Sequence, residues 1–210
     1  MIVLLIPAAL VFISRDRLNS SSPTSGDALV SSSQLSDPSV DVVTEVGSGQ
    51  CEVTSTEIRI IGSGMTSCRT TQWSASPYLD QQLSTEVSGI DEGATVVMRF
   101  RESGGRRIEV AVGRTAVVIR EKDGESWKVV TSVPRQIPPT VSSPVTSVVQ
   151  GSTHWLKVDL SGNLLTVEID GVVNATGTTS IDDSGFLSVA AVSDGSVAVR
   201  FSSITVTDVG

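Results

Sequence analysis

Four arginines, Arg99, Arg101, Arg106 and Arg107, lie close together in a chain whose formal net charge is -8. The first two alternate with apolar residues in Thr95 to Arg101, so we expect both to leave one face of a β-strand together, toward water. The planar fork of an arginine can hold a carboxylate or vicinal hydroxyls through two hydrogen bonds. The cluster therefore predicts a groove for an anionic or polyhydroxyl glycan.

Two aromatic residues, Trp73 and Tyr78, could add stacking surfaces to this groove. The predicted ligand-binding residues are Arg99, Arg101, Arg107, Trp73 and Tyr78. A plainer interpretation is a wet sheet face on which Glu102 and Glu109 balance the arginines, since surface ion pairs are common and weak. The sequence leaves both interpretations open.

The strands that would carry these residues follow from the alternation of apolar and polar side chains. Between Thr153 and Val209 the chain forms successive runs of this kind, separated by turns such as Ser161-Gly162-Asn163. The segment 95–133 has the same alternation, with no room for a crossover helix. Pro134 to Gly151 is rich in proline and is predicted to be a long surface loop. We therefore expect an all-β, antiparallel fold.

Composition divides the chain into three parts. Residues 1–17 include a continuous apolar run that is too short to span a bilayer, and they are predicted to be a signal or anchor segment. Alternatively, Met1 is a late start and apolar residues upstream complete a membrane helix. Residues 18–40 are rich in Ser, Pro, Asp and Gly and are predicted to be a disordered linker. Residues 41–210 are predicted to form one domain, held to the membrane or secreted.

Cys51 and Cys68 are the only cysteines in the chain. They flank a strand and the Gly62-Ser63-Gly64 segment, which we expect to be a hairpin turn, so the two thiols could face each other across the hairpin base. An exported chain with two cysteines most simply pairs them in a disulfide. With a single distant histidine, His154, sulfur and imidazole donors are too few for a zinc site, and no metal site is predicted.

The order of several segments resembles that of a known superfamily. The matching segments are Arg99-Phe100-Arg101, Arg107-Ile108-Glu109-Val110, Asp123-Gly124-Glu125, His154-Trp155-Leu156-Lys157-Val158, Val167-Glu168-Ile169-Asp170-Gly171, Gly185-Phe186-Leu187 and Val199-Arg200-Phe201. Their succession is similar to that in the concanavalin A-like lectin/glucanase superfamily, and more narrowly in lectin-like domains of exported bacterial proteins. The resemblance implies a two-sheet antiparallel jelly-roll sandwich. Many members of the superfamily bind or cleave glycans, so it also implies a carbohydrate partner.

Glycanases of this superfamily carry a Glu-x-Asp-x-x-Glu strand whose carboxylates act as nucleophile and general acid. The nearest match here is Glu168-Ile169-Asp170-Gly171, which lacks the third carboxylate. Asp170 is expected to occupy a hairpin turn. We therefore predict no catalytic residue and no enzymatic activity.

The remaining candidates for chemistry have ordinary structural explanations. His154 is interpreted as a strand-entry residue beside a core Trp155 rather than as a general base, because no nucleophile is near it in sequence. Asp182-Asp183 and Asp91-Glu92 could offer oxygen ligands to calcium, but they lack a spaced loop signature. Calcium stays possible, and no cofactor is predicted.

Three function classes follow from these features. The preferred one is a non-catalytic extracytoplasmic module that binds or senses a cell-wall or extracellular glycan. The alternatives are a structural or protein-interaction β-sandwich and a degenerate glycoside hydrolase. Nucleic acid is excluded as a partner, because phosphate-backbone binding needs clustered cations and this chain has a sequence pI near 4.6.

Overall fold

The computed structural model describes residues 28–31, 40–54, 56–70, 80–136 and 152–208. Within these ranges the regular structure is entirely β. The strands are β1 (Ala28–Ser31), β2 (Val40–Val53), β3 (Glu57–Thr70), β4 (Gln81–Ser88), β5 (Thr95–Ser103), β6 (Arg106–Val112), β7 (Ala116–Asp123), β8 (Ser126–Pro134), β9 (Thr153–Ser161), β10 (Leu164–Ile169), β11 (Val172–Thr178), β12 (Phe186–Asp194) and β13 (Val199–Asp208). No helix in this part of the chain is long and apolar enough to cross a membrane.

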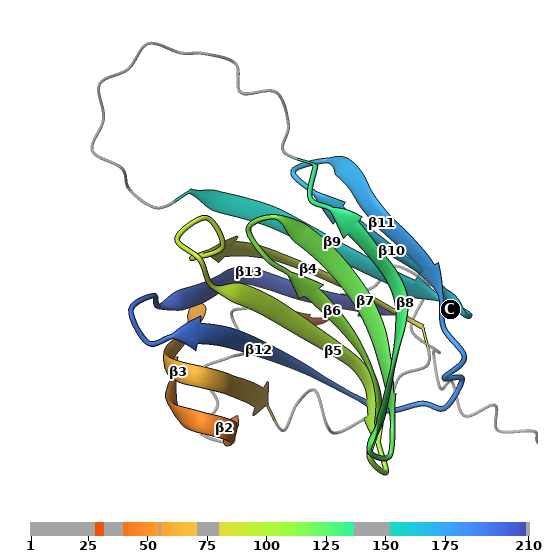
Figure 1. Ribbon diagram of the computed structural model, residues 1–210, viewed down its shortest axis with the longest axis horizontal. Helices are drawn as coiled ribbons and strands as arrows, with labels where there is room; N and C mark the ends of the chain where they lie inside the picture. Colours follow the sequence, from red (N-terminus) through yellow and green to blue (C-terminus); the bar gives the residue numbers. More distant parts are fainter. Residues whose placement is uncertain (1–27, 32–39, 55, 71–79, 137–151, 209–210) are drawn as a thin grey trace, which may run out of the picture.

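The strands form two layers, and all of their pairings are antiparallel (Figure 1). One layer has the order β11-β10-β9-β4-β13, and the other has the order β12-β5-β6-β7-β8. At the far end of the sandwich the layers approach again, where the Thr131 hydroxyl of β8 donates to the Thr176 carbonyl of β11 at 2.8 Å. The predicted jelly-roll sandwich is confirmed.

The core lies between the layers and is built from the apolar half of each alternating strand. In β4 every second residue is buried, beginning with Gln81, and in β9 the buried set is His154, Leu156, Val158 and Leu160. Val96, Met98 and Phe100 of β5 face them from the other layer. Burying each large apolar side chain stabilises the fold by about 1.5–3 kcal/mol, so the period-2 pattern determines which face of each strand turns inward.

Strand β3 joins the two layers because it pairs with both. Its first residues, Glu57 to Ile60, pair with β13, whereas Ser63 to Cys68 pair with β12. Strand β2 follows it along its whole length, and Gly49 lies opposite Gly62 where the pair bends. Gly62 has a φ of 139°, and a Cβ there would overlap the Ser48 carbonyl. Glycine is thus required at this corner.

This arrangement corrects one expectation. Gly62-Ser63-Gly64 lies inside β3 and is not a hairpin turn. The turn between β2 and β3 comes before it, where the Thr54 hydroxyl accepts a hydrogen bond from the Glu57 amide at 3.1 Å. The glycines allow a bend in a continuous strand, a use of glycine that a local pattern does not distinguish from a turn.

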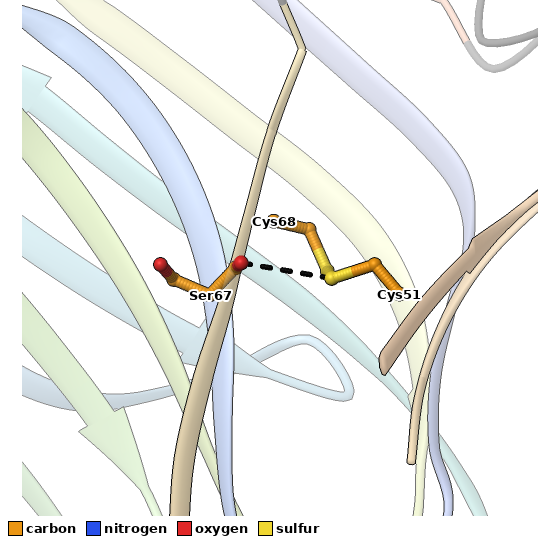
Figure 2. Close-up of a disulfide and its surroundings, with 3 residues drawn as sticks. All are labelled: Cys51, Ser67 and Cys68. Carbon is orange, nitrogen blue, oxygen red and sulfur yellow. Dashed lines mark hydrogen bonds between the residues drawn. A yellow bond between two sulfur atoms is a disulfide. The ribbon is translucent and has the colours of Figure 1, made fainter. Parts of the chain in front are cut away.

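The predicted disulfide between Cys51 and Cys68 is confirmed, although for a different reason (Figure 2). Cys51 lies opposite Ile60 in the ladder. Ile60 precedes Cys68 by eight residues along β3. In a straight strand these eight residues would cover about 26 Å, yet the Cα atoms of the two cysteines are 6.2 Å apart. The bridge therefore joins the two arms of the bent β2–β3 pair, where Cys68 is fully buried in the core.

We predict that replacing both cysteines by serine lowers the free energy of unfolding by about 3 kcal/mol, the value expected for opening a loop of this size. Denaturant unfolding of oxidised wild type and of the Cys51→Ser/Cys68→Ser variant measures the difference. Addition of a reductant to the wild type should reproduce it and should leave the variant unchanged. Equal midpoints for the oxidised wild type and the variant would contradict this role of the bridge.

The described residues bear on one of the N-terminal expectations. Within the predicted linker 18–40, Ala28–Ser31 forms β1, so the expectation of a structureless segment is wrong there. Strand β1 pairs with residues 205–207 of β13, which β3 leaves uncovered, and an open sheet edge is a ready partner for an extended segment. The apolar segment 1–17 and most of the predicted loop 134–151 lie outside the described residues.

Candidate functional site

The two arginines predicted to face solvent are buried. Arg99 is 0% exposed and Arg101 is 1% exposed. The alternation along β5 is as predicted, since Val96, Met98 and Phe100 do enter the core. The error concerns the other face of β5. Glu109 of β6 and Met65 of β3 contact the Arg99 guanidinium there. The backbone carbonyls of Gly162 and Ile181 contact the Arg101 guanidinium. Arg99 and Arg101 are therefore not part of an exposed groove.

Arg99 forms a buried ion pair. Its Nε donates to Oε1 of Glu109 on β6 at 2.9 Å, and both side chains are fully buried. The same carboxylate accepts hydrogen bonds from Nε of Arg107 at 2.9 Å and from Nε and Nη2 of Arg120 at 2.8 and 2.6 Å. Three guanidinium groups thus surround one carboxylate, which leaves an excess of positive charge on this face of the sheet.

Arg101 has a separate structural role at one end of the sandwich. It lies in a β-bulge of β5 with a φ of 51°. Its guanidinium donates to the Gly162 carbonyl at 2.6 Å and to the Ile181 carbonyl, and it lies 3.4 Å from a carboxylate oxygen of Asp80. These three partners come from segments far apart in sequence, so Arg101 links the connections at this end. The bulge explains why the alternation did not place it correctly.

We predict that Arg99→Ala lowers the free energy of unfolding by about 1.5–3 kcal/mol, because it removes a buried hydrogen bond between charged groups while Glu109 keeps Arg107 and Arg120 as partners. Arg106→Ala is the matched control. Arg106 is partly exposed and pairs with Asp183 and Asp123 at the surface, so its removal should cost less than about 1 kcal/mol. Thermal unfolding of both variants measures the contrast. An Arg99→Ala variant as stable as Arg106→Ala would show that the ion pair contributes little.

Trp127 lies beside this arginine cluster and was missed by the sequence analysis. It is 42% exposed. The guanidinium carbon of Arg120 lies 4.1 Å from the ring centroid, that of Arg107 lies 5.4 Å away, and Nζ of Lys122 lies 5.8 Å away. Strand pairing places Trp127 directly opposite Lys122. The short turn at Gly124-Glu125 could have revealed that pairing from the sequence, because a two-residue loop determines the register of a hairpin.

A hollow of about 210 Å³ adjoins the cluster. It is lined by Glu102, Ser103, Gly104, Gly105, Arg106, Arg107 and Phe186. Arg107 belongs to both the hollow and the surroundings of Trp127, so the two features are contiguous. We call this surface, formed by Trp127, Arg107, Arg120, Lys122 and the hollow, the basic face. Of the predicted ligand-binding residues, Arg107 lies on it, and Trp73 and Tyr78 lie outside the described residues.

A second polar cluster surrounds His154, which is mostly buried at the start of β9. Its Nδ1 lies 2.7 Å from Oδ2 of Asp170, and its Nε2 lies 2.9 Å from Oδ2 of Asp91 and 2.7 Å from Nη2 of Arg135. Asp170 occupies the β10–β11 turn with a φ of 51°, as predicted. Its other carboxylate oxygen accepts the Trp155 amide at 2.8 Å. The cluster therefore links the first residues of β9 to two loops and to the end of β8.

The expectation of a core Trp155 is wrong, since this residue is 40% exposed. His154, not Trp155, points inward, because the alternation in β9 is set by Leu156, Val158 and Leu160. A large aromatic residue is usually buried, but successive residues of a strand point to opposite faces. Trp155 therefore faces outward when the residues on either side of it point into the core.

Two of the four acidic residues considered as calcium ligands pair with protein side chains. Asp91 binds Arg135 and His154 and accepts a hydrogen bond from the Ser152 hydroxyl. Asp183 pairs with Arg106. Among the described residues, no group of three or more His, Cys, Asp or Glu side chains is placed to hold a metal ion.

Burial raises the pKa of Asp91, but hydrogen bonds from Ser152, His154 and Arg135 outweigh this effect and lower the pKa below its ordinary value. A carboxyl group whose pKa is lower in the folded state stabilises the fold above its unfolded pKa, about 3.9, and loses that contribution as the pH falls below it. We predict that Asp91→Asn costs about 1 kcal/mol at pH 7, a value reduced by the partial exposure of the carboxylate. The difference in melting temperature from wild type should shrink below about pH 4. A difference that stayed constant between neutral and acidic pH would contradict this assignment.

No protein-family model matches the sequence. No curated protein is significantly similar to it.

Solved structures with the same fold do exist. A protein of unknown function with a galectin-like fold from Bacillus subtilis aligns with a TM-score of 0.64 and 9% identity, over 88% of this chain and 97% of that chain. The carbohydrate-binding module CBM66 from Bacillus subtilis aligns with a TM-score of 0.58 and 13% identity, over 81% and 96%. A beta-glucanase from Bacillus licheniformis aligns with a TM-score of 0.57 and 11% identity, over 88% and 99%. The chain therefore has the fold of the concanavalin A-like lectins and glucanases.

Proposed function

We propose that this chain is a non-catalytic glycan-binding module and that its basic face binds an acidic polysaccharide. The observation that carries the proposal is the partly exposed Trp127 ring, with three cations within 5.8 Å of its centroid and a hollow beside it. Carbohydrate sites combine a flat aromatic surface with polar groups that fix orientation, and this surface has both.

The charge of the basic face favours an acidic ligand. Arg107, Arg120 and Lys122 gather around Trp127, while Glu109 is buried and already shared among arginines. Glu109 accepts hydrogen bonds from Nε and Nη2 of Arg120, and both Glu109 and Glu102 pair with Arg107. These contacts fix the directions of two planar guanidinium groups, a chemistry that suits a carboxylate or sulfate ligand. In a chain of net charge -8, this local excess of positive charge is a specific feature of one surface.

The shared fold and the disulfide support a location outside the cytoplasm. Disulfides persist in oxidising compartments and are rare in reducing ones. We therefore propose that the module is extracytoplasmic and either secreted or tethered to a membrane by its N-terminal segment. Its ligand would be a cell-wall or extracellular polymer. The lack of a complete acidic catalytic strand supports a binding role rather than hydrolysis, because Asp170 is committed to the β10–β11 turn.

A protein partner is the second candidate for the same surface. Trp and Arg are enriched among the residues that dominate protein–protein binding, and Val129, next to Trp127 on the same face of β8, is 60% exposed. A glycan screen separates the two candidates, because a protein-binding surface gives no binding to isolated polysaccharides.

We predict that the wild-type domain binds immobilised uronic-acid or sulfated polysaccharides and that added salt weakens the binding. Trp127→Ala should reduce the affinity about threefold to tenfold, with little change in melting temperature because the ring is partly exposed. Leu164→Ala, which removes an exposed apolar side chain from β10 in the other layer, should leave the affinity unchanged. The proposal fails if the wild type binds no acidic polysaccharide or if Trp127→Ala binds as well as the wild type.

A further inference from the structure

The opposite side of the sandwich carries a second partly exposed tryptophan. Trp155 projects from the outer face of the layer formed by β11, β10, β9, β4 and β13. Its neighbours on that face follow from strand pairing, which places Glu86 opposite Trp155 and Ser88 opposite Thr153. Because side chains two residues apart share a face, Thr153, Trp155, Lys157 and Asp159 form one row along β9.

Trp155 stands between two depressions of this surface. On one side is a cleft of about 640 Å³, whose lining includes Ser88, Glu92, Thr153, Ser196 and Arg200. On the other side is a hollow of about 140 Å³ lined by Lys157, Asp159, Thr166 and Glu168. From Thr153 to Asp159 the row extends about 20 Å. An extended ligand lying along β9 would therefore meet the cleft, the ring and the hollow in succession.

The groups around Trp155 suit hydroxyl groups and disfavour anions. The cleft contributes one carboxylate and one guanidinium, from Glu92 and Arg200, together with hydroxyl side chains. Beyond the cleft, Glu86, Asp159 and Glu168 outnumber the single cation Lys157. An acidic glycan would be repelled here, whereas an uncharged sugar could stack on the ring and exchange hydrogen bonds with these groups.

The His154 cluster holds the backbone of β9 at Trp155 from the core side. Asp170 accepts a hydrogen bond from the Trp155 backbone amide and contacts Nδ1 of the His154 imidazole. Asp91 contacts Nε2 on the other side of that imidazole. Asp91 adjoins Glu92 of the cleft wall, and His154 adjoins Thr153. The cluster thus ties the aromatic platform and the cleft to one rigid set of contacts, as a preformed binding site requires.

We infer that this face is a second ligand site, specific for an uncharged polysaccharide chain that runs along β9 and stacks on Trp155. It shares no residue with the basic face. The domain would then hold a neutral chain on one side and an acidic chain on the other.

The test is binding of the wild-type chain and single variants to neutral glucan, xylan and mannan oligosaccharides, measured by isothermal titration calorimetry. Trp155→Ala should weaken binding of the neutral ligand about threefold to tenfold. Trp155→Phe, which keeps an aromatic ring, should reduce the affinity for that ligand by a smaller factor. Thr153→Met, which fills part of the cleft with an exposed side chain, should also weaken it. Val129→Ala, an exposed apolar truncation on the opposite layer, is the matched control and should bind as the wild type does.

The two sites are distinguished by crossing the variants with the ligands. Trp155→Ala should leave binding of acidic polysaccharide unchanged, and Trp127→Ala should leave binding of neutral oligosaccharide unchanged. The inference is overturned if the wild type binds no neutral oligosaccharide, or if Trp155→Ala and Thr153→Met both bind one as tightly as the wild type. Either result leaves the proposal for the basic face intact, because that proposal depends on Trp127 and an acidic ligand.

Discussion

The bend in the β2–β3 pair is the constraint on which the two-layer arrangement depends. Because β3 pairs with β13 before the bend and with β12 after it, the layers belong to one continuous hydrogen-bonded ladder. A side chain at Gly62 would overlap the Ser48 carbonyl, and the Cys51–Cys68 bridge joins the arms that the bend brings together. From this corner one layer continues outward through β13, β4, β9, β10 and β11, and the other through β12, β5, β6, β7 and β8, so each strand's register depends on the neighbour nearer the corner.

A cluster of buried charged groups lies beneath each of the two tryptophan-bearing faces. Glu109 holds three arginines on the β5–β8 layer, and the cost of burying its carboxylate is offset by hydrogen bonds to all of them. On the other layer, Asp91 and Asp170 hold His154. Glu109 thereby fixes the arginines beside Trp127, and Asp170 holds the backbone amide of Trp155. Preorganised side chains bind a ligand with less loss of conformational entropy.

The two outer faces consequently have opposite electrostatic character although they share one core. The basic face joins a tryptophan to an excess of guanidinium groups, whereas the Trp155 face joins a tryptophan to an excess of carboxylates. A sandwich allows this because outward residues of the two layers are separated by the full thickness of the core, about 10 Å between sheets. Each face can therefore change its chemistry while the inward pattern stays the same.

The sequence by itself determined the all-β class, the inward residues of β5, the turn at Asp170-Gly171 and the pairing of the two cysteines. The first three are local properties, because alternation and turn chemistry depend on neighbouring residues along the chain. The cysteine pairing followed instead from the presence of only two cysteines in a chain expected to be exported. The sequence did not determine that Arg99 and Arg101 are buried, that Trp155 is exposed or that Gly62 bends a strand. Exposure of an outward side chain depends on which strands lie beside it and on bulges that change its direction, and only the tertiary structure decides both. For the same reason Trp127, Arg120 and Arg107 come together only in the folded chain, where pairing of β6, β7 and β8 places residues from three strands around one ring.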